Sequence, residues 1–171
     1  MRGFSLIEVI VAVSILSTGI VASTALINRT ISAGLVVRNQ LVAVNLAQEG
    51  MEVIHNIRHT NWIEEAVDGT TEWDDGLIDG NSCVQFDSTA LISAGTCGDI
   101  NLNERMLYIF NDGTNINYTH ILTATPTNFF RHINISSGDD DGTPYKLINS
   151  TVSWGNTSIS VAERLYNWKQ L

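Results

Sequence analysis

The chain has 171 residues, with 9 Lys and Arg against 18 Asp and Glu, so its formal net charge is −9. This length suffices for one hydrophobic helix and one small domain. A surface that binds phosphates needs the opposite charge, so direct contact with nucleic acid is disfavoured. Eight of the acids lie between residues 64 and 87 with no Lys or Arg among them, which indicates a solvated loop rather than a specific site.

The first 27 residues form the most distinctive stretch of the chain. A short basic head, residues 1–3, precedes residues 4–27, which carry a single charge, Glu8. At about 1.5 Å per residue, a helix over this run would reach roughly 36 Å, enough to cross the hydrocarbon of a membrane. A carboxylate inside such a run costs a few kcal/mol or more, which favours a functional reason for Glu8.

Three interpretations of this stretch compete. One is a secretory signal cut after residues 23–25, which the minimal basic head, the long apolar run and the internal acid disfavour. Another is a plain single-span anchor, with Glu8 at the cytoplasmic boundary of the membrane. The third is a retained helix whose Glu8 meets a partner inside a protein assembly. Composition alone leaves the last two open.

The helical pattern continues beyond this stretch. Apolar residues recur in pairs four apart, and the pairs repeat every eleven residues, which is three helical turns. The pairs are Ile31 with Leu35, Val42 with Leu46, and Val53 with Ile57. We therefore expect one helix over about residues 5–58, apolar all round at first and amphipathic over 28–58. Gly19, Gly34 and Gly50 indicate either close helix packing or local melting, and both remain open.

The second half of the chain predicts β-strands. The expected strands cover residues 83–86, 105–110, 118–123, 128–136, 145–154 and 158–168. Strict alternation places Ile148, Val152 and Trp154 on one face, and Gly155-Asn156 is typical of a tight hairpin turn. These patterns predict an α+β fold in which a mostly antiparallel sheet is covered by the amphipathic half of the helix.

The chain holds two cysteines, Cys83 and Cys97. If the amino-terminal stretch directs export, the oxidising compartment permits a disulfide between them. Closing a loop of this size would stabilise the fold by about 3 kcal/mol in the chain-entropy model. Two free thiols are the alternative, and the spacing does not fit a metal site.

The remaining constellations give weak signals for ligands. Asp139, Asp140 and Asp141 are a weak calcium candidate, but the EF-hand spacing is absent and a polar hairpin turn explains them equally well. His55 and His59 are four apart, yet no companion of a metalloprotease motif follows. No nucleophile elbow or glycine-rich phosphate loop occurs, so we expect no catalytic residues, no resident metal, no cofactor and no enzymatic activity.

The segment over residues 3–9, which reads GFSLIEV, resembles the processing motif of the type IV pilin and pseudopilin superfamily. The resemblance implies cleavage between Gly3 and Phe4 by a prepilin peptidase, N-methylation of Phe4, and a role for Glu8 in docking subunits. It also implies a pilin-like fold, in which a long amino-terminal helix packs on an antiparallel sheet. Residues 1–3 would be the leader, 4–27 the transmembrane and assembly helix, 28–58 its amphipathic continuation, and 59–171 the head.

Three segments are similar to minor pilins of the PilV type and to I-type minor pseudopilins of type II secretion. They are residues 151–155 (TVSWG) and 165–168 (LYNW) in the carboxy-terminal stretch, and residues 48–52 (QEGME). This likeness implies a low-abundance subunit that helps to start a filament. The implied partners are other pilin subunits, the prepilin peptidase and methyltransferase, and an inner-membrane assembly platform. The implied location is the cytoplasmic membrane, single-pass with the head outside, and then the pilus. A major pilin and a membrane-anchored adhesin or ligand-binding domain are the alternatives.

Overall fold

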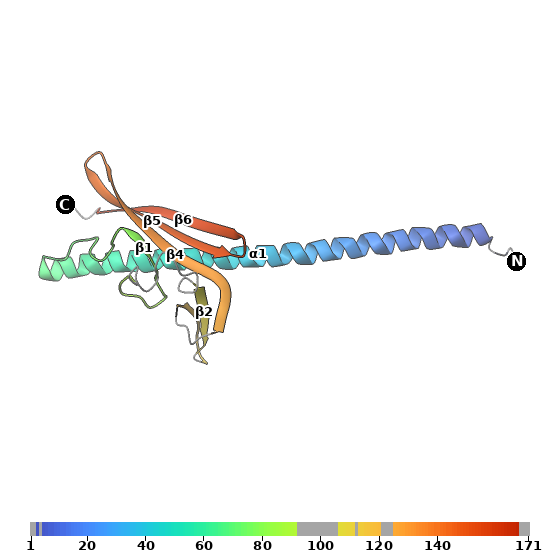
Figure 1. Ribbon diagram of the computed structural model, residues 1–171, viewed down its shortest axis with the longest axis horizontal. Coiled ribbons are helices and arrows are strands. Elements are labelled where there is room, and N and C mark those ends of the chain that lie inside the picture. Colours follow the sequence, from blue (N-terminus) through green and yellow to red (C-terminus); the bar gives the residue numbers. More distant parts are fainter. Residues whose placement is uncertain (1–2, 4, 92–105, 112, 121–124, 168–171) are drawn as a thin grey trace. The chain divides into compact units, whose positions relative to one another are not determined.

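The computed structural model describes residues 3, 5–91, 106–111, 113–120 and 125–167. The elements in chain order are α1 Leu6–Asp68, β1 Gly80–Ser82, β2 Met106–Asn111, β3 Ile116–Thr119, β4 Thr125–Asp140, β5 Thr143–Trp154 and β6 Thr157–Tyr166 (Figure 1). The chain divides into two compact units, Met1–Leu41 and Val42–Leu171. The predicted α+β class, with a long amino-terminal helix and an antiparallel sheet, is confirmed.

Helix α1 ends at Asp68, ten residues after the predicted end at residue 58, so the loop predicted over residues 64–87 is wrong for residues 64–68. The helix ends where Gly69, at φ 66°, donates its backbone N–H to the Glu65 carbonyl at 2.9 Å. Glycine adopts this left-handed conformation at low cost, so it is a common stop signal. Asn61 also belongs to the helix, and its Nδ2 donates to the carbonyls of Trp73 and Asp75 at 3.2 and 2.8 Å. These bonds hold the chain that returns from the helix end.

The sheet has the strand order β3-β2-β4-β5-β6, with β1 paired to β4, and every pair is antiparallel. Asp141 and Gly142, at φ 52° and 86°, form the tight turn between β4 and β5. Two consecutive positive-φ residues match the twist of a two-residue hairpin. The predicted hairpin of β5 and β6 is confirmed, with Trp154 opposite Thr157.

The strand predicted over residues 83–86 is wrong, because the regular pairing with β4 ends at Ser82, opposite Ile133. Val84 is fully buried in the core although it belongs to no strand. A buried apolar residue outside a strand gives the same local pattern as a strand residue, which explains the wrong prediction. Strand β4 is longer than the predicted 128–136 and includes the acidic end of the hairpin. Residues 105, 121–123 and 168 of the predicted strands lie outside the described residues.

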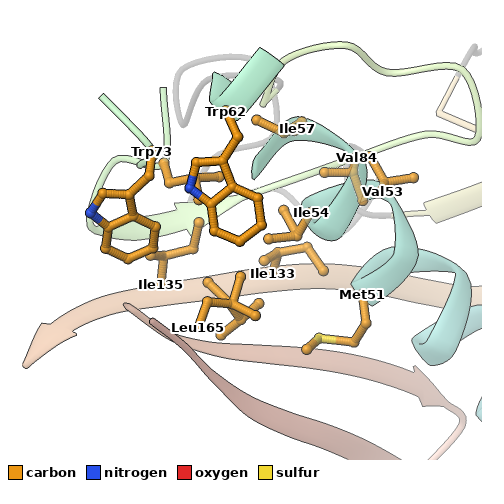
Figure 2. Close-up of a cluster of buried hydrophobic side chains, with 12 residues drawn as sticks. Met51, Val53, Ile54, Ile57, Trp62, Trp73, Val84, Ile133, Ile135 and Leu165 are labelled. Carbon is orange, nitrogen blue, oxygen red and sulfur yellow. The ribbon is translucent and has the colours of Figure 1, made fainter. Parts of the chain in front are cut away.

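The core of the second unit lies between the later part of α1 and strands β4 to β6, which run beside it in Figure 1. Figure 2 shows Ile54 of α1 among Ile133 and Leu165 from the strands, with both tryptophans at one side of the cluster. The buried members of this cluster are Met51, Val53, Ile54, Ile57, Trp62, Trp73, Leu77, Val84, Ile133, Ile135, Ile148 and Leu165. The predicted alternation in β5 is confirmed, because Ile148, Ser150 and Val152 are buried at every second position.

Arg131 of β4 is fully buried within this unit. Its Nη1 donates to the Leu46 carbonyl of α1 at 2.9 Å and to Glu49 Oε1 at 3.0 Å, and its Nη2 donates to the Val84 carbonyl at 2.7 Å. Burial lowers the pKa of the guanidinium, and the Glu49 carboxylate opposes that shift. One side chain thus joins β4, α1 and the segment after β1, because a buried charge requires such partners.

Gly50 lies where α1 comes nearest to the sheet. A Cβ at this position would lie 2.8 Å from Ser150 Oγ and 3.0 Å from Ile133 Cδ1. For Gly50 the structure therefore favours close packing over local melting. Gly19 and Gly34 have no such neighbour within 4 Å, so neither alternative is favoured for them.

We predict that Gly50→Ala lowers the free energy of unfolding of the second unit by about 1–3 kcal/mol, because overpacking displaces β4 and β5. Thermal unfolding in detergent, followed by the fluorescence of Trp62 and Trp73, measures the change. Gly34→Ala is the matched control and should leave the midpoint unchanged, since its Cβ meets no neighbour. Equal midpoints for Gly50→Ala and the wild type would contradict the packing role.

Candidate functional site

Glu8 lies in the first turn of α1. The Ser5 carbonyl accepts the backbone N–H groups of Glu8 and Val9 at 3.0 and 3.3 Å, so the helix begins directly after Ser5. A serine followed three positions later by a glutamate is the order of a capping box, and a carboxylate near a helix amino terminus is stabilised by the helix dipole. Glu8 and Gly3 are both exposed, and Phe4 lies outside the described residues. The Glu8 carboxylate is therefore accessible to a partner.

The helix surface around Glu8 is apolar and exposed. Every described residue from 5 to 41 is exposed, and large side chains such as Leu6 and Ile20 are 77% and 67% accessible. Among the described residues, α1 is the one helix long and apolar enough to cross a membrane, with a mean hydropathy of 2.2 in its best window. Such a surface fits lipid or other apolar helices, because in water it would be costly.

Hydroxyl groups on this surface are satisfied within the helix. Ser14, Thr18 and Ser23 each donate to the carbonyl four residues before, at 2.8 Å. Thr24 does the same to the Ile20 carbonyl at 2.9 Å. A polar group that is bonded internally does not need water, so these residues are compatible with an apolar environment.

A groove of about 660 Å³ lies between α1 and the edge strand β6, and we call it the α1–β6 groove. Its lining residues are Gln48, Met51, Glu52, His55, Asn56 and His59 from α1, and Val161 and Glu163 from β6. The groove combines apolar side chains with two carboxylates, those of Glu52 and Glu163. The sequence predicted the His55 and His59 pair and a strand at β6, but not that the two lie together, because Glu163 is 108 residues after His55.

Arg58 is buried beside the two histidines of the groove, and its contacts determine which ring nitrogens carry a proton. Arg58 Nη2 lies 3.3 Å from His55 Nδ1, and because a guanidinium only donates, Nδ1 must accept. The proton of neutral His55 is therefore on Nε2, which donates to Glu163 Oε2 at 3.1 Å.

The pKa of His59 is lowered from 6.5, first by burial and then by the positive charge of Arg58 and by His55. Its Nε2 lies 3.5 Å from Arg58 Nη2, which again requires an acceptor. The Arg58 guanidinium also stacks 4.7 Å from the ring centre of Trp62. The lowered pKa of His59 favours the neutral form of this imidazole in the α1–β6 groove.

Part of the acidic segment over residues 64–87 is held to the sheet. Lys146 of β5 lies 3.5 Å from Asp74 and 3.2 Å from Asp79. The pKa of the Asp79 carboxyl is lowered, mainly by the backbone and hydroxyl hydrogen bonds from Ser137 and also by Lys146. The expectation of a solvated loop missed these contacts, since Lys146 follows the segment by some sixty residues.

The candidate calcium residues lie at the hairpin between β4 and β5. Asp139 Oδ1 accepts the Gly142 N–H at 2.7 Å, and Asp140 Oδ2 accepts from Arg164 and Tyr166 at 3.1 and 3.2 Å. These carboxylates therefore stabilise the turn and the β6 end. Within the described ranges, no group of three or more His, Cys, Asp or Glu side chains is arranged to hold a metal ion.

The disulfide between Cys83 and Cys97 stays a prediction. Cys83 is fully buried directly after β1, whereas Cys97 lies outside the described residues.

Comparison with known proteins identifies the amino-terminal segment. Residues 1–24 match the family model of the prokaryotic N-terminal methylation motif. No curated protein and no solved structure matches the chain. The chain therefore carries a prepilin signal of the type IV pilin kind at its amino terminus, and the match does not extend to the second unit.

We predict that acidification weakens the second unit through His59. A histidine with a lowered folded-state pKa binds fewer protons than in the unfolded chain, so stability falls as the pH drops below about 6.5. In His59→Gln, which keeps an acceptor for Arg58, the loss of stability between pH 7 and 5 should be smaller. Urea unfolding at both pH values measures it, and the same comparison above pH 7 is the control. Identical pH profiles would contradict this role.

Proposed function

We propose that the chain is a structural subunit of a type IV pilus or pseudopilus, cleaved between Gly3 and Phe4 and N-methylated on Phe4. The observation that carries this proposal is that three features occur together on one helix. The prepilin signal at residues 1–24 coincides with an exposed apolar surface, and the same helix supplies core residues such as Ile54 to the second unit. A plain anchor would need the apolar surface only.

The proposed mechanism has a storage stage and an assembly stage. Before assembly, the apolar part of α1 is held in the cytoplasmic membrane with the head outside. During assembly, the Glu8 carboxylate pairs with the amine of Phe4 in the same or an adjacent subunit. A paired carboxylate in a filament core is far less costly than an isolated one, so the pair sets subunit register more than affinity.

The proposed partners are other pilin subunits, the prepilin peptidase and methyltransferase, and an inner-membrane assembly platform. Among subunits, we place the chain with the low-abundance, initiating kind. The support for this is the likeness of residues 48–52 and of the carboxy-terminal stretch to such subunits.

We predict that mature protein from sheared filaments begins at methylated Phe4. Mass spectrometry of the amino-terminal peptide identifies both the cleavage and the methyl group. The same spectra, calibrated with labelled peptides, give the ratio of this subunit to the bulk one, which should be well below one. A mature chain beginning after Ala25 would exclude assembly, and a ratio near one would identify a major subunit.

We predict that Glu8→Gln lowers incorporation into filaments by about tenfold or more, since removing one partner of a buried pair costs several kcal/mol. Immunoblots of sheared filaments against the membrane fraction measure incorporation. Glu64→Gln, at an exposed acid near the other end of α1, is the matched control and should assemble normally. Normal incorporation of Glu8→Gln would remove the basis of the pairing.

A further inference from the structure

Charge is divided unequally along the chain. Residues 9–41 contain two charges, Arg29 and Arg38, and both are exposed. Residues 42–171 contain 17 Asp and Glu against 6 Lys and Arg. A basic surface and an acidic one on the same molecule are complementary between copies, which favours association in one orientation.

Arg29 and Arg38 belong to residues 28–41, which we call the outer helix segment. It follows the 4–27 run, so in a subunit held in the membrane it projects beyond the hydrocarbon. Its large apolar side chains are nevertheless exposed, namely Ile31 at 59%, Leu35 at 56%, Val36 at 62%, Val37 at 63% and Leu41 at 61%. A contiguous patch of exposed aliphatic side chains typically marks a surface that another protein covers.

The α1–β6 groove has the complementary chemistry. Met51 and Val161 supply apolar surface, and the carboxylates of Glu52 and Glu163 supply negative charge. Glu163 is 49% exposed although it accepts a hydrogen bond from His55, so it retains access to a cation. His55 Nδ1 and His59 Nε2 both accept from Arg58, so neither of these two nitrogens carries a proton. The nearest cation, Arg58, is 7% exposed and points its guanidinium at the two imidazoles.

We propose that the α1–β6 groove binds the outer helix segment of a second copy of this chain, with Arg38 of one copy beside Glu52 and Glu163 of the other. The proposal rests on the proposed function, because it requires subunits that assemble side by side through parallel helices. The contact is heterologous: each copy offers its groove to one neighbouring copy and its outer helix segment to another, so it forms where copies of this low-abundance subunit are adjacent.

The positions of the two surfaces on α1 restrict when this contact forms. Glu52 is fourteen residues after Arg38, about four helical turns further along the same helix. Two copies whose apolar runs lie at the same depth of a membrane bring equal residue numbers level, which keeps these side chains apart. The contact therefore forms when one copy is displaced outward along the helix direction, as in a filament, and not between two copies stored in the membrane.

Charge reversal tests the pairing. Arg38→Glu alone and Glu52→Arg alone should each lower incorporation into filaments by about tenfold, since each places like charges together, and the chain carrying both reversals should recover most of it. Glu64→Arg, on the same helix outside the groove, is the matched control and should assemble normally. Failure of the double reversal to recover, with both single variants impaired, would overturn the pairing, as would normal incorporation of either single variant.

Cysteine cross-linking tests the stagger. Cells express two versions of the full chain, one with Arg38→Cys and one with Glu52→Cys, and an oxidant is added to sheared filaments and to membranes from a strain without the assembly motor. We expect a cross-linked dimer in filaments and none in the membranes. A dimer in both fractions, or in neither, would overturn the inference. If the protein keeps its leader and is absent from filaments, the proposed function fails instead, and the two results are distinguishable on one blot.

Discussion

The buried guanidinium of Arg131 is the constraint on which the arrangement of the second unit depends. A charge with no exposed surface is costly unless its donors find acceptors, and the two Nη atoms of Arg131 find them on α1 and on the segment after β1. The Leu46 carbonyl and Glu49 fix the position of α1 along β4, and the Val84 carbonyl fixes the segment after β1. Gly50 lies one turn from Leu46, so the missing side chain allows the approach that the arginine requires. The polar contact specifies the register, whereas the apolar clusters provide most of the stabilisation.

Helix α1 meets two different environments, and its sequence is adapted to each. Toward the amino terminus, hydroxyl groups bond back to carbonyls such as that of Ile10, so these hydroxyls are compatible with an apolar environment. From Ala43 onward, one face is buried in a protein core, and the polar groups that contact it, such as Asn61, reach partners far along the chain. The first part is suited to exchange lipid for other helices. The second part is held by long-range contacts and is expected to remain folded during that exchange.

Local patterns predicted the elements of this fold, and long-range contacts account for what they missed. The alternation through Ile148 and Val152 predicted β5 and its buried face, because a strand's faces follow from a period of two. The helix end was misplaced because His59 to Trp62 has weak helical propensity, whereas packing of Trp62 and the bonds of Asn61 keep the helix intact to Asp68. The amino-terminal motif is contiguous, so sequence sufficed for Glu8. The groove combines α1 with β6, and no local signal indicates that Glu52 and Glu163 lie on one surface.

The Glu8 pair and the groove contact would act at different ranges and in different media. Glu8 is surrounded by apolar residues, where a charge pair is strong but forms only when its two groups lie close together. The Glu8 pair therefore selects among subunit positions that differ little along the helix axis. The groove is solvent-exposed, where a single pair contributes little by itself and salt weakens it. Apolar burial of side chains such as Leu35 must therefore supply most of the groove's affinity, while Arg38 supplies the direction. Because the groove contact is heterologous and runs one way along α1, it favours a polar arrangement of adjacent copies over a closed dimer.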